Sequence, residues 1–309
     1  MPPDAHPIRI AALYQFTPLD SLAALRGDLL SLCRAQAIKG TLLLAREGIN
    51  GTIAGSDAGI TAVIAFLRAL PGCADLGVKY SHAEAMPFKR LKVRLKAEIV
   101  SMGQPHIDPL QGAGHYVEAA AWNALIADPG TVVIDTRNAY EVKIGTFARA
   151  INPATRSFRE FPAWFRAHRD RLLAAGPQTK VAMFCTGGIR CEKGILELQQ
   201  KGYKNVYQLH GGILNYLKEL PNSQFEGECF VFDQRVAVDQ NLKPSQQYKL
   251  CPHCGQPGKT PVDCKRCDTH TFICEDCAEL DWKKDTCSKN CAYQYELHPE
   301  RKGVRQERG

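Results

Sequence analysis

One stretch in the second half of the chain constrains its fold most, because it joins a strand, a cysteine-containing loop and a helix. The apolar run Val181-Ala182-Met183-Phe184 predicts a short buried strand, and apolar residues recur at helical spacing after Glu192. Between them lies the loop Cys185-Thr186-Gly187-Gly188-Ile189-Arg190, which Cys191 follows directly. A cysteine at the carboxyl end of a parallel strand lies where open α/β sheets build their sites.

The chemistry expected of this loop is that of a stabilised thiolate. Backbone N–H groups at a helix N-terminus favour negative charge, and glycines allow several amides to turn toward one anion. Such surroundings lower the pKa of a thiol and favour its reactive form. We therefore predict that Cys185 is catalytic and that Thr186, Gly187, Gly188 and Ile189 form the active-site loop. The competing interpretation is a structural cysteine in a tight turn.

Two residues beside Cys185 each have two interpretations. Arg190 either orients the loop or binds a phosphate, or it forms a structural salt bridge with an acidic residue such as Asp135. Cys191 falls in the first helical turn, where it either resolves an oxidised or persulfidated Cys185 or packs the helix as a small buried residue. Both residues are candidate catalytic groups.

Length and composition favour several globular domains. A chain of 309 residues with 45% hydrophobic residues suits two or three domains. No run approaches the ~20 apolar residues of a membrane helix, and the first seven residues lack the character of a signal peptide. We therefore expect a cytoplasmic protein without a membrane partner, in which the clustered ones among the 13 cysteines are metal ligands or redox groups. The net charge of +7 favours an acidic partner such as RNA.

Residues 1–105 predict a basic α/β domain of the ferredoxin-like or acylphosphatase-like type. The order β-α-β-β-α-β is that of the split βαβ unit. The predicted elements are a strand over 8–16, a helix starting at Thr17-Pro18, a strand over 41–45, a hairpin turn over 47–51, a strand over 52–54, a helix between Ser56 and Leu70, and strands over 77–80 and 91–100.

The last of these strands has an unusual charge pattern. Because side chains alternate between the faces of a strand, four basic residues share one face: Arg90, Lys92, Arg94 and Lys96. Like charges at ~7 Å intervals repel each other unless something anionic lies across them. We predict that this face binds RNA through its phosphates, the alternative being a solvated sheet face.

Residues 116–222 predict a parallel-sheet α/β domain that resembles the rhodanese family. Strands and helices alternate here. Asp135-Thr136-Arg137, with Glu141 after it, resembles the opening motif of that family, and the six-residue loop from Cys185 resembles its active-site loop. The run Val206-Tyr207-Gln208-Leu209-His210-Gly211-Gly212 resembles its closing strand and turn. One departure is Gly145-Thr146-Phe147, which stands where many rhodaneses have a Gly-His pair.

Over residues 8–230 the chain also resembles the oxygen-dependent tRNA uridine(34) hydroxylase family, a group with a rhodanese domain. Four strings carry the resemblance: Gly48-Ile49-Asn50-Gly51-Thr52, Pro87-Phe88-Lys89-Arg90-Leu91-Lys92-Val93, Ile134-Asp135-Thr136-Arg137-Asn138 and Cys185-Thr186-Gly187-Gly188-Ile189-Arg190-Cys191-Glu192-Lys193. It implies that the wobble uridine of certain tRNAs is converted to 5-hydroxyuridine with molecular oxygen. It further implies that Cys185 is essential, as thiolate or persulfide. The partner would be the anticodon arm, with a sulfur or electron donor as a possible second partner.

The residues alone leave other functions open. A cradled thiolate equally suits a persulfide-forming sulfurtransferase without an RNA substrate, and this is the alternative function. The hydroxylase hypothesis uses Cys185 as a nucleophile at C6 of uracil, which makes C5 electron-rich. The sequence shows no motif for an organic cofactor and no evident two-His-one-carboxylate iron set. A scaffold without activity is a third hypothesis, and the presence of Cys185 argues against it.

Residues 229–309 predict a small Cys-rich zinc-binding module with a basic tail over 301–305. Its eight cysteines form four closely spaced pairs: Cys251/Cys254, Cys264/Cys267, Cys274/Cys277 and Cys287/Cys291. Because two such pairs complete a tetrahedron of thiolates, we predict two structural zinc ions. The spacing leaves sequential and crossed pairing open, and an iron–sulfur cluster is the alternative to zinc.

Overall fold

The N-terminal part of the chain forms a five-stranded sheet with two helices. Its elements are β1 (Ile8–Phe16), α1 (Leu22–Ala35), β2 (Lys39–Ala45), β3 (Gly48–Gly55), α2 (Asp57–Arg68), β4 (Gly77–Ala83) and β5 (Leu91–Leu95). The strand order is β4-β1-β3-β2-β5, so β1 and β3 lie at the centre of the split βαβ unit. The predicted βαββαβ fold is confirmed, and β5 is an additional edge strand parallel to β2.

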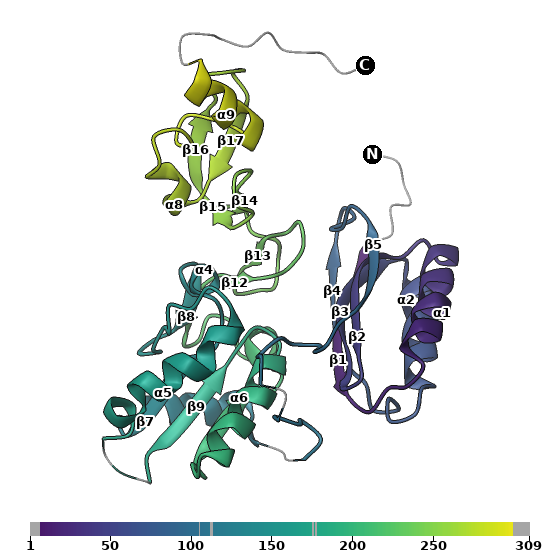
Figure 1. The fold of residues 1–309 in the computed structure, drawn as a ribbon, viewed down its shortest axis with the longest axis vertical. Coiled ribbons are helices and arrows are strands. Elements are labelled where there is room, and N and C mark those ends of the chain that lie inside the picture. Colours follow the sequence, from purple (N-terminus) through teal and green to yellow (C-terminus); the bar gives the residue numbers. More distant parts are fainter. Residues whose placement is uncertain (1–6, 105, 112–113, 175, 177, 299–309) are drawn as a thin grey trace. The chain divides into compact units, whose positions relative to one another are not determined.

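Both helices lie on one face of this sheet (Figure 1). The core between them contains the strand residues Ala11, Leu42 and Ile53 together with Leu29 of α1 and Ile60 of α2. Because strand residues alternate between faces, the neighbours of these strand residues point to the opposite face, which carries no helix. This helix-free face becomes important below.

Three local predictions for this domain are wrong in detail. α1 begins at Leu22 rather than at Thr17. The hairpin turn lies at residues 46–47, and Gly51 sits within β3 instead of in the turn. A Cβ on Gly51 would lie 2.2 Å from a backbone oxygen of β2, so this glycine permits close approach of the strands. β5 ends at Leu95 rather than at residue 100.

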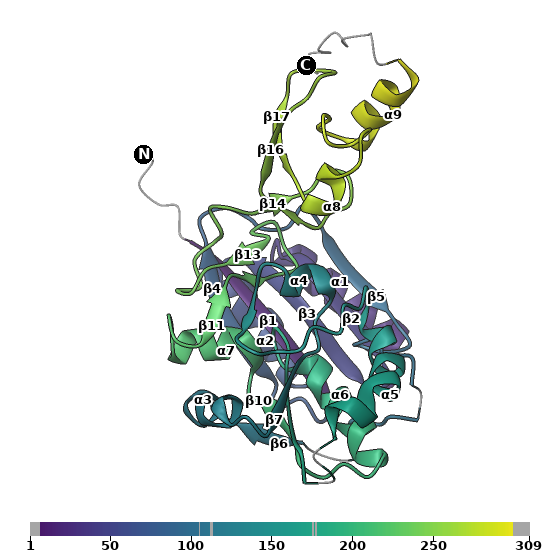
Figure 2. The same cartoon turned by 90° about the vertical axis from the view of Figure 1, so that its left-hand side faces the viewer.

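A four-stranded parallel sheet follows, in the order β6-β10-β9-β7. Figure 2 labels three of its strands, β6, β7 and β10. This arrangement agrees with the parallel sheet predicted for residues 116–222. Its elements are β6 (His115–Val117), α3 (Ala119–Ala127), β7 (Thr131–Asp135), α4 (Ala139–Val142), β8 (Gly145–Phe147), the 3₁₀ helix η1 (Phe158–Glu160), α5 (Phe161–Leu172), β9 (Lys180–Phe184), α6 (Ile189–Gln200), β10 (Val206–Leu209), α7 (Gly212–Glu219) and β11 (Phe225–Gly227).

The remaining elements are short. They are β12 (Cys229–Phe230), β13 (Ala237–Val238), β14 (Lys249–Leu250), β15 (Pro257–Gly258), β16 (Thr260–Asp263), β17 (His270–Ile273), α8 (Glu275–Ala278) and α9 (Lys289–Leu297). The small apolar core here consists of Val262 and Ile273 with three of the paired cysteines. Such a small core agrees with a module that needs metal ions for its stability.

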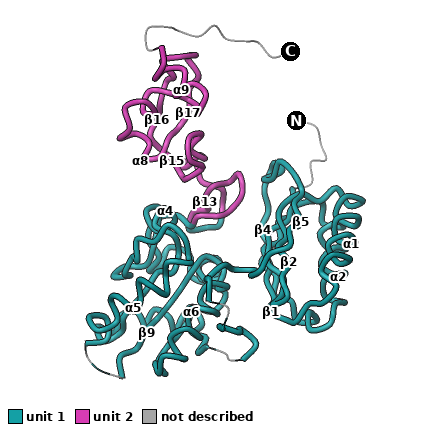
Figure 3. Tube along the Cα trace, viewed as in Figure 1, with its two compact units in different colours: residues 1–229, 240–242 teal, residues 230–239, 243–309 magenta. Residues whose placement is uncertain are grey.

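The chain divides into two units, residues 1–229 with 240–242 and residues 230–239 with 243–309 (Figure 3). This computed structural model describes residues 7–104, 106–111, 114–174, 176 and 178–298. The basic tail over 301–305 lies outside the described residues. The predicted boundaries at 105, 116, 222 and 229 stay predictions. No helix in the described part of the chain is long and apolar enough to cross a membrane.

Candidate active site and metal centres

Cys185 lies between β9 and α6, at the carboxyl end of the parallel sheet. Gly188 closes the loop with a φ of +102°, and α6 begins at the next residue. Cys185 is 1% exposed, and its Sγ accepts a hydrogen bond from the backbone N–H of Gly188 at 3.1 Å. The loop therefore has the geometry that the sequence predicted, with a buried sulfur at a helix N-terminus.

The surroundings of Cys185 stabilise its thiolate. Burial opposes ionisation, but three other effects outweigh it: a hydrogen bond from Cys191, the positive charge of Arg190 and the backbone N–H groups of Arg190 and Gly188. Together they lower the pKa of Cys185 to about 6. At pH 7 a thiol with this pKa is about nine-tenths ionised.

Cys191 has the opposite environment. Its side chain is buried, and its Sγ lies 3.6 Å from Oγ1 of Thr136. Burial and the adjacent Cys185 thiolate raise the pKa of Cys191 well above its usual range. Cys191 therefore remains a thiol and donates its hydrogen to Cys185.

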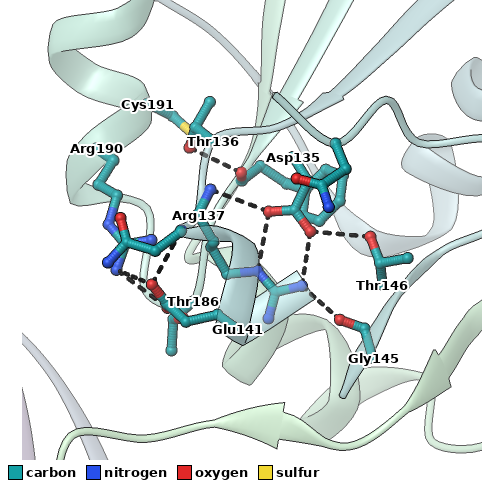
Figure 4. Close-up of polar contacts among 12 residues, drawn as sticks. Asp135, Thr136, Arg137, Glu141, Gly145, Thr146, Thr186, Arg190 and Cys191 are labelled. Atoms are coloured by element: carbon teal, nitrogen blue, oxygen red, sulfur yellow. Dashed lines mark hydrogen bonds and ion pairs between the residues drawn. The ribbon is translucent and has the colours of Figure 1, made fainter. Parts of the chain in front are cut away.

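Arg190 forms its salt bridge with Glu141 (Figure 4). The suggested partner Asp135 is therefore wrong: Nη2 of Arg190 lies 2.9 Å from Oε2 of Glu141, whose side chain is completely buried. Glu141 also accepts a hydrogen bond from Oγ1 of Thr186 at 3.4 Å. The carboxylate thus holds Arg190 and the active-site loop together, with the guanidinium close to the sulfur.

Asp135 pairs instead with Arg137, two residues further along (Figure 4). Nε and Nη2 of Arg137 donate to the two carboxylate oxygens at 2.9 and 2.6 Å, and both side chains are buried. Thr146, which departs from the rhodanese pattern, donates its hydroxyl to Oδ2 of Asp135 at 2.8 Å. The departure is therefore accommodated by a hydrogen bond to this buried ion pair.

The N-terminus of α7 closes the active-site loop from the other side. The backbone N–H groups of Ile213 and Leu214 donate to the carbonyl oxygens of Cys185 and Thr186 at 3.0 and 3.1 Å. Gly212 has a φ of +68°, and a Cβ on it would lie 2.5 Å from the carbonyl oxygen of Cys185. This close approach explains Gly212, whereas at Gly211, with a φ of +69°, a Cβ would lie 2.6 Å from Cβ of Asn215.

Two side chains of the N-terminal sheet also reach the loop and the helix that follows it, and no sequence pattern indicated them. Lys79 donates through Nζ to the carbonyl oxygen of Gly187 at 3.1 Å. The hydroxyl of Tyr14 donates to Oε1 of Glu192 at 3.1 Å, and Tyr116 donates to Oε2 at 2.9 Å. Burial, followed by the charges of Glu192 and Cys185, raises the pKa of Tyr14, so its phenol stays protonated. The N-terminal domain therefore contributes to the surroundings of Cys185.

A buried lysine strengthens the same junction. Lys193, in the first turns of α6, is 1% exposed, and its Nζ lies 2.8 Å from a carboxylate oxygen of both Glu47 and Glu98. Glu47 belongs to the turn between β2 and β3. This ion cluster joins the helix that follows the active-site loop to the N-terminal domain.

A third cysteine near the loop was also missed. Cys229 is completely buried and bonds to the side chain of Thr186. Burial raises the pKa of Cys229 to about 12 despite the nearby charge of Arg137. Cys229 is therefore protonated at neutral pH, unlike Cys185.

The four predicted RNA-binding residues lie at the edge of the N-terminal sheet. Arg90, Arg94 and Lys96 are exposed and Lys92 is half-buried. Val93, between them, is buried against the helices, so the predicted alternation of faces is present in β5.

The eight paired cysteines form two clusters, each with four Sγ atoms within 4.8 Å of one another. The clusters are Cys251, Cys254, Cys274 and Cys277, and Cys264, Cys267, Cys287 and Cys291. The first pair therefore joins the third and the second joins the fourth. Of the two pairings that the spacing left open, the structure has the crossed one.

The geometry of both clusters fits a single metal ion. A tetrahedral zinc site with Zn–S bonds of about 2.3 Å places its sulfurs about 3.8 Å apart. The distances between sulfurs are 3.4 Å for Cys254 and Cys274 and 3.4–3.7 Å among Cys267, Cys287 and Cys291. An iron–sulfur cluster would place several atoms between its thiolates and would hold them farther apart.

Comparisons with known proteins cover nearly the whole chain. Family models match a UPF0176 acylphosphatase-like domain over residues 8–99, a rhodanese-like domain over 118–219 and a rhodanese C-terminal segment over 226–292. The tRNA uridine(34) hydroxylase of Bdellovibrio bacteriovorus is 50% identical over 299 residues, which are 96% of this chain and 84% of that protein. The enzyme of the same name from Gluconobacter oxydans is 59% identical over 253 residues, 81% of this chain and 80% of that protein. The enzyme of that name from Caulobacter vibrioides is 57% identical over 254 residues, which are 81% of this chain and 80% of that protein.

Proposed function

Since the chain belongs to the tRNA uridine(34) hydroxylase family, we propose that it hydroxylates C5 of the wobble uridine in tRNA, with Cys185 as the catalytic cysteine and dioxygen as the oxidant. The observation that carries the role of Cys185 is its buried, ionised sulfur beside Arg190 and two backbone N–H groups. A thiolate is the nucleophilic form of cysteine. The wobble uridine lies in a single-stranded loop, from which a base can be splayed out at modest cost.

In the proposed reaction the Cys185 thiolate adds to C6 of uracil. A bond forms between sulfur and C6, and the electron pair of the C5–C6 double bond moves into an enolate over C5, C4 and O4. C5 then attacks dioxygen, and a proton completes a hydroperoxide at C5. Loss of the original C5 proton and departure of the thiolate restore the double bond.

Two further electrons are needed to reduce the hydroperoxide, and the neighbouring thiols Cys185 and Cys191 can supply them. Their oxidation to a disulfide releases two electrons and two protons, cleaves the O–O bond, and leaves a hydroxyl at C5 and one water. Uridine, dioxygen and two thiols thus become 5-hydroxyuridine, water and one disulfide. An external dithiol donor would reduce the disulfide. Support for this role is the hydrogen bond between the two sulfurs.

We propose the following roles for the other predicted site residues. Arg190 is a positioning residue that keeps its positive charge beside the thiolate. The anticodon arm contacts the basic face of the edge strand through its phosphates, and the residues of this face are Arg90, Lys92, Arg94 and Lys96. Zinc is the proposed ion of both four-cysteine clusters, where thiolates fill all four positions and the ion is structural.

The test is mass spectrometry of tRNA nucleosides from cells that lack this protein and any redundant pathway. Wild type should restore 5-hydroxyuridine-type nucleosides, whereas Cys185→Ser should not. Cys73→Ser makes the same exchange at a buried position of the N-terminal domain and serves as the control. Growth under ¹⁸O₂ should add two mass units to the hydroxylated nucleoside.

Two results would contradict the proposal. Full hydroxylation by Cys185→Ser would exclude the cysteine mechanism. Unchanged hydroxylation together with altered thiolated nucleosides would instead indicate the sulfurtransferase alternative.

A further inference from the structure

The helix-free face of the N-terminal sheet carries a row of residues that crosses all five strands. The strand register places Lys79, Ala12, Thr52, Thr41 and Lys92 opposite one another, in the order β4-β1-β3-β2-β5. Residues opposite one another in neighbouring strands point to the same face. We call this row, together with Tyr14, Leu43 and Arg94 of the next row, the basic strip.

The residues of the basic strip are at least partly exposed, whereas the residues that alternate with them on β1, β2 and β3 face the core. All of the strip is half-buried except Arg94, which is exposed. The alternate residues, such as Ala11, Leu42 and Ile53, are completely buried under the helices. The centre of the strip consists of small and hydroxyl-bearing residues, so a chain molecule could approach the sheet closely there.

The charged side chains that the strands place on this face are all basic. Four basic residues lie on it within the strands: Lys39, Lys79, Lys92 and Arg94. In the described strands β1 to β5, this face includes no aspartate or glutamate. Such a surface is complementary to phosphates.

One end of the basic strip lies at the active-site loop. Lys79 donates to the carbonyl oxygen of Gly187, and the hydroxyl of Tyr14 donates to Glu192, in the first turn of α6. A Cβ on Gly188 would lie 3.0 Å from the Tyr14 hydroxyl. The strip therefore leads from the basic edge strand β5 to the loop that holds Cys185. Four strand spacings of about 4.8 Å make it about 19 Å long, the reach of a few unstacked nucleotides.

We propose that the basic strip binds the single-stranded nucleotides next to the target uridine and delivers that uridine to Cys185. The proposal rests on the proposed function for the identity of the RNA. It extends the RNA contact beyond the edge strand: Ala12, Thr41 and Thr52 lie under the RNA, and Lys79 and Tyr14 form its junction with the active site.

The first test measures binding of a fluorescein-labelled anticodon stem-loop RNA with uridine at the wobble position, by anisotropy at several salt concentrations. Each lost phosphate contact of a single strand reduces the slope of log K against log salt by about 0.7. Lys92→Gln/Arg94→Gln should therefore reduce the slope by about 1.4, and Arg94→Gln alone by about 0.7. Arg34→Gln, an exposed arginine at the end of α1, should leave the slope unchanged. Equal slopes for the wild type and all three variants would overturn the proposal.

A second test does not depend on the stability of variants. The same RNA carries 4-thiouridine beside the wobble position and is photocrosslinked to the full-length wild-type chain. Mass spectrometry should find the crosslinks in peptides that contain β1 or β3. Crosslinks found only outside the N-terminal sheet would overturn the proposal.

The two proposals fail in different experiments. If the strip variants keep wild-type slopes while wild type still produces 5-hydroxyuridine, the basic strip is wrong and the hydroxylase function stands. If wild type binds RNA through β1 and β3 but restores no 5-hydroxyuridine in cells, the RNA-binding face stands and the reaction assignment fails.

Discussion

The reactivity of Cys185 depends on a small number of neighbouring charges and hydrogen bonds. Because its pKa is lowered to about 6, the thiolate predominates above that pH and the inert thiol below it. We therefore expect alkylation of Cys185 by iodoacetamide to reach half its maximal rate near pH 6, measured by peptide mass spectrometry. Cysteines with unperturbed pKa values should reach half-maximum above pH 8.

Substitution of the neighbouring arginine should change this profile. Arg190→Gln removes a positive charge beside the sulfur and should raise the pKa of Cys185, so that alkylation at pH 6.5 becomes severalfold slower. Arg166→Gln, at an exposed position of α5, should have the profile of the wild type. If the pH midpoint of Cys185 alkylation were unchanged in Arg190→Gln, the backbone N–H groups and Cys191 alone would be sufficient to lower the pKa of Cys185.

The sequence predicts only those parts of the site whose residues are close together in the chain. Cys185, its glycines and Arg190 are adjacent in the chain, and the order of strand, loop and helix determines their geometry. Tyr14 and Lys79 lie 178 and 108 residues away from the groups they bond. Nothing in the spacing of residues indicates such contacts, because they follow from how the domains pack. Arg190 pairs with Glu141 rather than with Asp135 because of the fold within its own domain, where Asp135 is already paired with Arg137.

Among the secondary-structure elements next to the active-site loop, α7 has a strict requirement at its first residue. Gly212→Ala would place a Cβ 2.5 Å from the carbonyl oxygen of Cys185 at a positive φ. We expect a loss of about 2 kcal/mol in the free energy of unfolding, measured with urea. Gly187→Ala is the matched control, because a Cβ there meets no heavy atom within 4 Å. Equal stability of the two variants would show that α7 can shift away from the loop.

The position of α6 depends on the buried ammonium of Lys193. Lys193→Met leaves Glu47 and Glu98 without their cation. Breaking a buried ion pair lowers the free energy of unfolding by several kcal/mol. Because these two carboxylates keep some solvent exposure, we expect a loss of about 3 kcal/mol in that free energy, at the lower end of this range. Lys180→Met, which breaks an exposed pair with Asp128, should cause no measurable loss.

The effect of Lys193→Met should also depend on pH. Burial alone would raise the pKa of Glu98, but the hydrogen bonds from Lys193 and from the backbone N–H groups of Met102 and Gly103, together with the charge of Lys193, outweigh it and lower that pKa. A lowered pKa in the folded state means that the stabilisation is present above the unfolded value of about 4.3 and is lost as the pH falls further. The stability difference between wild type and Lys193→Met should therefore shrink below about pH 4. A difference that is constant down to pH 3 would contradict this account.

For the edge strand β5, the alternation of basic and apolar residues predicts some structural features but not others. The alternation of basic and apolar residues predicted the two faces correctly. It could not predict that β5 lies parallel to β2, since the two strands are about 50 residues apart and either sheet edge would suit the alternation. The basic strip follows from this pairing, because it needs the register of all five strands.

For the whole molecule, metal content is the decisive measurement. We expect two zinc ions for each chain by elemental mass spectrometry, and loss of one ion in Cys254→Ser or Cys267→Ser. The crossed pairing is tested by double variants. Cys254→Ser/Cys277→Ser affects one cluster and should lose one ion, whereas Cys254→Ser/Cys267→Ser affects both and should lose two. Sequential pairing would give the reverse result, and iron in place of zinc would contradict the metal assignment.

The eight metal-binding cysteines could be identified from the sequence, but their partners could not. Each pair has nearly the same spacing, so any two pairs can complete a tetrahedron. The choice depends on the fold between them: β16 and β17 pair antiparallel and bring Cys264 near one end of the hairpin and Cys274 near the other.

The crossed clusters have a consequence for biosynthesis of the protein. A ribosome adds residues in order, and the first cluster lacks its last ligand until Cys277 has been made. By then the chain already contains Cys264 and Cys267, which must stay reduced and unpaired until Cys291 follows. Neither ion can therefore be fully coordinated early in translation, and the two sites are completed within 14 residues of each other at the very end of the cysteine-rich segment.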